Sequence, residues 1–347
     1  MGDRTMAAVN VRRDVRDRLL EVTARPIWVV LATAAAVHLL GVRLPTDVQY
    51  GILLATVLLL GLPHGALDHL TLPRARAESL TARRFVVFCG WYLLLASAYG
   101  VAWLVAPTAS FVGFVLLTWF HWGQGDRAHL ALVTDAAHLE NPWVNRLTLF
   151  VRGGLPMLVP LIWFPDAYES VLATVVGLFG SSGDWIASLF SSEARLALGV
   201  GFGLLTLATL AWGYRVAGDR PAWRIDVVET ILLWVFFLSV PPILAIGLYF
   251  VVWHSLRHLA RLVAIDDTAA SALARGSTTG VLTRLTRDAL PMTAGALVLF
   301  GAIAVLVPTE PGTVADVAGV YLVLLAVLTL PHAVVVTVLD RIQGVSP

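Results

Sequence analysis

Histidines are the residues of this sequence best suited to chemistry, and two of them have a chelating spacing. His254 and His258 are four residues apart, which on a helix places both imidazoles on one face, about one turn apart. Two ligands from one helix fix much of the geometry of a metal site. Single histidines from two other apolar segments, His64 and His121, complete a candidate four-histidine site.

Carboxylates accompany these histidines along the chain. Asp68 follows His64 by about one helical turn, Asp126 follows His121, and Glu229 lies near the start of another apolar segment. Metal-bound histidines usually donate their second ring N–H to a carboxylate or a carbonyl. We therefore predict that these three acids orient the ligands. The lone cysteine, Cys89, excludes an internal disulfide and cysteine-based metal sites.

The elements that must position these groups are membrane helices. Of the 347 residues, 58% are hydrophobic and 14% are charged, and the mean hydropathy is +0.80. Soluble domains carry about 25% charged residues, so a soluble enzyme is excluded. The net charge of +1 gives no indication of nucleic-acid binding. The composition predicts an all-α, polytopic transmembrane helix bundle.

Apolar runs of about 17–25 residues mark the expected spans. We count about ten, and eight if two short segments, 109–125 and 226–240, do not cross. The segment 168–190 is apolar but broken by glycines, and it is expected to be interfacial or re-entrant. The expected spans are 26–42, 48–69, 85–106, 109–125, 146–165, 195–214, 226–240, 242–263, 289–307 and 314–338.

The arginines predict the orientation of these spans. They gather in the loops after the second, fourth, sixth and eighth spans, whereas the opposite side carries only Arg43 and Arg195. Positive residues favour the cytoplasmic side. We therefore expect both termini in the cytoplasm and a multi-pass protein of the cell (inner) membrane. We expect residues 1–25 to form an arginine-rich cytoplasmic arm and residues 26–340 to form one integral-membrane domain that holds the candidate site.

This topology brings histidines from four spans to the cytoplasmic leaflet. Ionisable residues inside spans are costly and point to function. His38 falls on the other side of the membrane. His129 and His138 fall in a loop and are expected to be solvated. The histidines of the cytoplasmic leaflet are His64, His69, His121, His254, His258 and His332.

Four motifs give the sequence a family resemblance over about residues 50–335. They are GLPHGALDH (61–69), FHWGQGD (120–126), WHSLRH (253–258) and LPH (330–332). In combination they resemble the histidine motifs of the Brp/Blh family of membrane-embedded β-carotene 15,15′-dioxygenases. The second motif often reads His-Phe-Gly in that family, whereas this chain has His121-Trp122-Gly123. That exchange is expected to reshape a substrate tunnel without abolishing metal binding.

The resemblance implies a function and a set of ligands. It implies oxygenative cleavage of the central double bond of β-carotene to two retinal molecules, with O₂ as co-substrate. One iron(II) per chain would be held by His64, His121, His254 and His258, the four that helix spacing also favours. His69 and His332 match family motifs and are expected beside the ligands or on the substrate side. A rhodopsin is a possible consumer of the retinal.

The substrate would need an apolar channel that is reached through the bilayer. Trp122, Tyr249 and Trp253 adjoin the expected ligands in sequence and are the predicted channel residues. Three alternatives stay open at this point. A di-iron membrane desaturase or hydroxylase needs more histidines in several His-boxes. A carotenoid or retinal carrier would hold a structural metal, and a haem-b protein would need histidines facing each other across the bundle.

Overall fold

The structure, a computed structural model, describes residues 13–134, 136–218 and 220–345, and all of its regular elements there are helical. The predicted all-α fold is therefore confirmed. The helices that build the bundle are α2 (Arg25–Leu39), α3 (Thr46–Thr56), α6 (Ala82–Val105), α7 (Pro107–Val133), α8 (Pro142–Trp163), α10 (Ser192–Val216), α11 (Arg220–Ser239), α12 (Pro242–Leu248), α13 (Leu256–Ile265), α15 (Thr278–Leu306) and α16 (Val314–Ile342). The shorter elements are α1 (Arg13–Leu19), α4 (Leu62–Gly65), α5 (Asp68–Ala75), α9 (Pro165–Gly177), α14 (Asp267–Ala274), the 3₁₀ turns η3 (Ala137–Glu140) and η4 (Asp184–Phe190), and the π-helical turns η1 (Leu20–Ala24), η2 (Val57–Gly61) and η5 (Tyr249–Ser255).

Local sequence signals explain where several long helices begin. Asn141 caps α8, because its side chain accepts from the backbone N–H groups of Trp143 and Val144. Thr313 and Asp316 form a reciprocal capping box at the start of α16. Proline occupies the first turn of α7, α8, α9 and α12, where a missing N–H costs nothing.

Seven helical segments of the described chain are long and apolar enough to cross a membrane. The protein is therefore a membrane protein, but the predicted count of ten is not confirmed. The three predicted spans that are not among these segments, 48–69, 109–125 and 226–240, are also largely helical. The seven segments are Arg13–Leu39, Ala82–Val105, Pro142–Trp163, Ser192–Val216, Pro242–Ile265, Thr278–Leu306 and Val314–Ile342.

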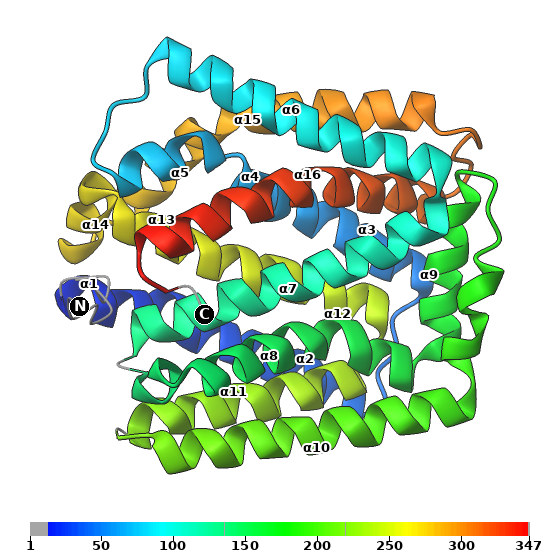
Figure 1. Ribbon diagram of the computed structural model, residues 1–347, viewed down its shortest axis with the longest axis horizontal. Helices are drawn as coiled ribbons and strands as arrows, with labels where there is room; N and C mark the ends of the chain where they lie inside the picture. Colours follow the sequence, from blue (N-terminus) through cyan, green and yellow to red (C-terminus); the bar gives the residue numbers. More distant parts are fainter. Residues whose placement is uncertain (1–12, 135, 219, 346–347) are drawn as a thin grey trace.

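The long helices lie side by side, and α16 and α7 run through the middle of the bundle (Figure 1). α6 and α15 pack on one side of α16, whereas α8, α10 and α11 stack beyond α7. Both ends of the described chain lie at the same end of the molecule (Figure 1). Residues 1–12 of the predicted arginine-rich arm, which include Arg4 and Arg12, lie outside the described residues. The remainder of that arm is helical and leads directly into α2.

Two π-helical turns interrupt helices at the histidine motifs. η2 ends at Gly61, three residues before His64, and η5 contains His254. A π-helical turn adds one residue to a turn and rotates the side chains that follow it, and such turns occur often at functional sites. These turns therefore set the direction in which two of the candidate ligands point.

α7 and α8 approach each other closely through glycines. A side chain on Gly153 would collide with the backbone carbonyl of Trp119, and one on Gly123 would collide with the carbonyl of Leu149. Such contacts between backbones require glycine at both positions. α7 carries His121, so this contact also sets the depth of one candidate ligand in the bundle.

We predict that Gly153→Ala destabilises the protein by at least about 1–3 kcal/mol, the usual cost of overpacking, because backbone atoms cannot yield. Thermal unfolding of the purified protein in detergent measures the effect. Gly201→Ala in α10 is the matched control, since a methyl group there meets no atom within 4 Å. Equal melting temperatures for the two variants would contradict the close α7–α8 contact.

Candidate metal centre

Five histidines from four parts of the chain converge in the interior. The ring nitrogens of His64, His121, His254 and His332 form a compact group, all within 4.8 Å of one another. All four rings are buried. The fifth, His258, is also buried, and its ring centroid lies 5.0 Å from that of His332 and 5.7 Å from that of His64.

The outer nitrogens of two rings are held by acceptors. Nδ1 of His332 donates to Asp68, with N···O distances of 2.7 and 2.9 Å. Nδ1 of His64 donates to the backbone carbonyl of Gly61. These bonds fix each ring plane and leave the Nε2 lone pair directed elsewhere. Tyr92 on α6 also donates to Oδ2 of Asp68, at 3.1 Å, which holds the carboxylate in place.

The inner nitrogens are short of partners. Nε2 of His121 and Nε2 of His254 face each other at 3.1 Å. Nε2 of His332 and Nε2 of His258 are buried and accept from no hydrogen-bond donor among the described residues. Buried polar atoms without partners are rare and need an explanation. Several imidazole lone pairs gathered in one small volume are the donor set of a metal cation.

Three of the four predicted ligands, His64, His121 and His254, fall in the compact group. The structure adds His332 to them and places His258 in a neighbouring group with Asp68 and His332. His69, the other histidine of the first motif, lies at the edge of the pocket described below. Its Nδ1 bonds to the carbonyl of Ala66 at 3.0 Å, and it takes no part in the cluster.

Of the three predicted orienting acids, only Asp68 contacts a cluster histidine. Asp126 and Glu229 bind arginines instead. Arg257 donates to Asp126 at 2.6 Å and to Glu229, and Arg152 donates to both acids and to Asp226. All five groups are buried. The prediction for Asp126 and Glu229 is corrected because buried guanidinium groups compete for these carboxylates.

This buried ion network holds the helices that carry the ligands. Asp126 lies five residues after His121 on α7, and Arg257 lies between His254 and His258 on the chain. The 2.6 Å contact between these two side chains therefore fixes α7 against η5 and α13. Arg152 adds α8 to the same network, and Glu229 adds α11. Charged pairs in an apolar interior tolerate little displacement.

A second buried carboxylate fixes α16. Asp340 accepts from Arg127 and Gln124 of α7 at 3.1 and 2.9 Å, and from Arg261 of α13 at 2.5 Å. The helix that carries His332 is thereby tied to the helices of His121 and His258. The arginines of both networks were not among the predicted site residues. Arg152 and Asp340 lie in or next to apolar runs, and ionisable residues there are a signal that was available in the sequence.

Besides His69, three histidines lie outside the cluster, and the expectation for two of them is wrong. His129 is on α7 and His138 is in η3, and both are buried rather than solvated. His138 donates to Asp226 at 3.2 Å and so extends the ion network. His38 is buried, with its Nδ1 at 2.9 Å from the carbonyl of Ala34.

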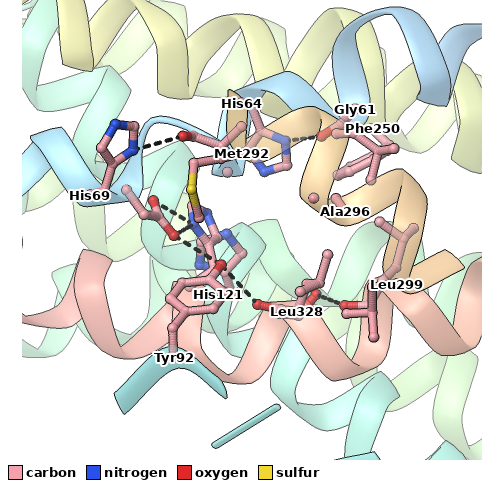
Figure 2. Close-up of a pocket in the computed structure, with 18 of the residues that line it drawn as sticks. Gly61, His64, His69, Tyr92, His121, Phe250, Met292, Ala296, Leu299 and Leu328 are labelled. Carbon is pink, nitrogen blue, oxygen red and sulfur yellow. Dashed lines mark hydrogen bonds and ion pairs between the residues drawn. The ribbon is translucent and has the colours of Figure 1, made fainter. Parts of the chain in front are cut away.

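A mostly apolar pocket of about 270 Å³ opens onto the cluster. The rings of His64, His121, His254 and His332 form its polar end, and His258 does not line it. Figure 2 shows His64 and His121 in this lining. Apolar side chains from α6, α7, α15 and α16 form the remaining walls, including Met292, Leu299 and Leu328. A ligand in this pocket would therefore be a hydrophobic molecule with one part placed against the histidines.

Only one of the three predicted channel residues lines this pocket. Trp122 lines it and lies beside His254, with ring centroids 5.6 Å apart. Tyr249 and Trp253 are fully buried but are absent from its walls. Trp253 instead donates to Asp126 at 2.7 Å and packs under the Arg257 guanidinium. Phe250 and His254 of the same turn, η5, line the pocket instead.

Arg257→Met is predicted to destabilise the folded protein by about 3–5 kcal/mol, because it leaves the buried carboxylates of Asp126 and Glu229 to share one cation, Arg152. Arg287→Met is the matched control, since the Arg287 side chain is 72% exposed and its ion pair with Asp288 is superficial. The control should change stability by no more than about 0.5 kcal/mol. Thermal unfolding compares the two variants, and a stable Arg257→Met protein would contradict the role given to the network.

Comparisons with known proteins agree with one another. A family model described as "Beta-carotene 15,15'-dioxygenase" matches residues 55–340. "Probable beta-carotene 15,15'-dioxygenase Blh" of Halobacterium salinarum is 46% identical over 319 residues, 92% of each chain. "Probable beta-carotene 15,15'-dioxygenase Brp" of the same species is 30% identical over 344 residues, 95% of this chain and 94% of that protein. "Beta-carotene 15,15'-dioxygenase" of an uncultured marine bacterium is 25% identical over 60% of this chain and 67% of its own length. No solved structure matches.

Proposed function

This chain belongs to the β-carotene 15,15′-dioxygenase family, and we propose that it cleaves the central double bond of β-carotene to two molecules of retinal. The observation that carries this function is the convergence of buried histidines at the end of a mostly apolar pocket. β-Carotene is a hydrocarbon, so its binding site must be apolar. Cleavage by O₂ needs a redox-active metal at the reacting bond.

The donor set fits such a metal. Nitrogen ligands about 2.0–2.1 Å from a first-row metal lie at most about 4.2 Å apart. The four compact ring nitrogens, within 4.8 Å of one another, are close to that arrangement. Imidazole suits iron, zinc, copper and nickel, and of these iron(II) is the one we propose, one per chain, with O₂ as co-substrate. Four ligands leave up to two of the six positions of iron(II) open.

The proposed ligands include His64, His121 and His254, which both the sequence and the compact group contain. For the fourth we propose His332, because it lines the pocket and its Nδ1 donates to Asp68. A carboxylate on the outer nitrogen is the usual partner of a metal-bound imidazole. His258, the fourth ligand implied by the family resemblance, lies behind this group and is the competing assignment.

Each part of the site has a distinct role in the proposed reaction. The bound iron supplies the activation of O₂ at the central double bond. Asp68 and the carbonyl of Gly61 keep the Nε2 atoms of His332 and His64 in their unprotonated, ligating form. The apolar walls hold the polyene and exclude water from the reacting atoms. Both oxygen atoms enter the two aldehydes, so no external reductant is required.

We also propose the membrane arrangement predicted from the sequence. Residues 26–340 form one integral-membrane catalytic domain, with about ten spans in the cell membrane. Residues 1–25 form a cytoplasmic arm. Both described chain ends lie at one end of the bundle, which supports placing both termini on the same side of the membrane (Figure 1). The arginine distribution favours the cytoplasm as that side. β-Carotene and retinal would exchange through the bilayer, and a rhodopsin would be one consumer of the retinal.

The arrangement of histidines disfavours the di-iron alternative. Five of the nine histidines gather in the cluster, and His38, His69, His129 and His138 make other contacts or lie apart. Two irons would therefore have few ligands each. A carrier with a structural metal has no need of open coordination positions facing the pocket, and product formation separates it from an enzyme.

The function is tested by expression in a β-carotene-accumulating bacterium, with extracted pigments separated by chromatography. Wild-type protein should convert the carotenoid to retinal, and His254→Ala should give none, because it lacks a proposed ligand. His38→Ala is the matched control and should remain active, because it changes a buried histidine that lies outside the cluster. Unchanged β-carotene in cells with well-expressed wild-type protein would overturn the proposal.

The fourth ligand is tested by metal analysis of the purified variants. We expect His332→Ala to lose most of its iron and His258→Ala to retain it. Asp68→Asn should weaken iron binding by about 10–100-fold, as for other carboxylates that orient a metal-bound histidine. The reverse pattern, with iron lost from His258→Ala and kept by His332→Ala, would restore the ligand set implied by the resemblance.

A further inference from the structure

Two helices whose outer faces are largely exposed form one wall of the pocket. α6 contributes Phe88, Cys89, Tyr92 and Leu93, and α15 contributes Met292, Gly295, Ala296 and Leu299. Only 6% of the most apolar window of each helix is buried inside the molecule. Large apolar surfaces of this kind belong in contact with lipid in a membrane protein. The wall of the pocket is therefore also the boundary between the protein and the bilayer.

The pocket reaches the outer surface between these helices. Leu93 lines the pocket, yet it is 60% exposed, and Gly295 on the other helix also lines the pocket and is exposed. The backbones of α6 and α15 both pack against α16 and approach each other little. They lie next to each other along one side of the bundle (Figure 1). An opening between them leads from the lipid-facing surface toward the histidines.

Glycine at position 295 keeps this opening wide. A Cβ atom built there meets no other atom within 4 Å. The helix would therefore accept a side chain at this position, and that side chain would project into free space at the edge of the pocket. Met292 and Leu299, one turn on either side, line the interior of the same wall (Figure 2).

The size of the pocket requires an opening. Its volume of about 270 Å³ is just below the roughly 300–1,000 Å³ found for the pockets of drug-sized ligands. A long polyene cannot be enclosed in it, so only the part near the histidines can lie inside. The remainder of the molecule must pass out through the wall. The named residues at the gap, Leu93 and Gly295, carry no charge that would oppose a hydrocarbon.

We propose that the rod-shaped carotenoid hydrocarbon enters laterally from the bilayer through the opening between α6 and α15, at Leu93 and Gly295. This inference rests on the proposed function for the identity of the substrate. Its physical basis is the continuity of an apolar pocket with a lipid-facing surface. The route keeps the hydrocarbon in apolar surroundings throughout, so no step requires its transfer through water.

Gly295→Phe tests the route by filling the opening. In liposomes that contain β-carotene, we expect this variant to form retinal at least 10-fold more slowly than wild type, with unchanged iron content. Gly301→Phe is the matched control: it lies on the same helix, is exposed, has no atom within 4 Å of its Cβ position and does not line the pocket. It should act within twofold of wild type. Wild-type rates for Gly295→Phe would overturn the route.

Cys89 gives a second test that does not depend on turnover. It is the only cysteine of the chain and lines the pocket from α6. We expect β-carotene in the vesicles to slow its alkylation by N-ethylmaleimide at least fivefold in wild type and to have no such effect in Gly295→Phe. In a Cys89→Ala, Gly90→Cys control, the thiol moves to an exposed position outside the pocket and should gain no protection.

The two measurements separate failure of the route from failure of the function. Protection of Cys89 by β-carotene without retinal formation by wild type would overturn the proposed function and support the route. Retinal formation without protection of Cys89 would overturn the route and support the function. Equal slow alkylation in vesicles with and without β-carotene, which would indicate an acyl chain of the lipid in the opening, also contradicts the route.

Discussion

Three buried carboxylates hold the candidate metal centre together, and each joins helices that are distant in sequence. Asp126 links α7 to α8 and α13, Asp340 links α16 to α7 and α13, and Asp68 links α5 to α16 and α6. A carboxylate in an apolar interior must be paired, so each helix is confined to positions where the pairs are made. The positions of the histidines are confined in the same way. Each helix that carries a proposed ligand either contains one of these acids or a residue bonded to one, or lies next to a helix that does.

The site has two faces with different chemistry. Behind the histidines lie ion networks that fix the positions of the rings. In front lies a mostly apolar pocket whose outer wall is formed by lipid-facing helices. Rigid placement of ligands on one side and open access for a hydrocarbon on the other are both needed for an oxygenase that acts on a membrane-dissolved substrate. The buried polar side chains follow this division: α7, α8, α11 and α13 each carry several, and α6 and α15 carry none.

Much of this arrangement follows from the sequence, and the limits have physical causes. The composition predicts a helical membrane protein, and the i, i+4 spacing of His254 and His258 directs attention to the right segment. Adjacency to a ligand in sequence does not place a side chain on the same face, because successive helical residues lie about 100° apart. Tyr249 and Trp253 each precede a pocket residue, Phe250 and His254, and extend the core instead of the pocket. Partner choice among buried charges is equally hidden, so the arginine partners of Asp126 and Glu229 emerge only from the structure.

The metal content of the purified wild-type protein tests the central claim most directly. The five clustered histidines supply the four proposed ligands and one further imidazole, which is enough for one mononuclear centre. The account predicts one iron per chain by elemental analysis after reconstitution with iron(II). Two irons per chain would contradict it and return the di-iron oxygenases to consideration, and protein that binds no iron would contradict the metal centre itself.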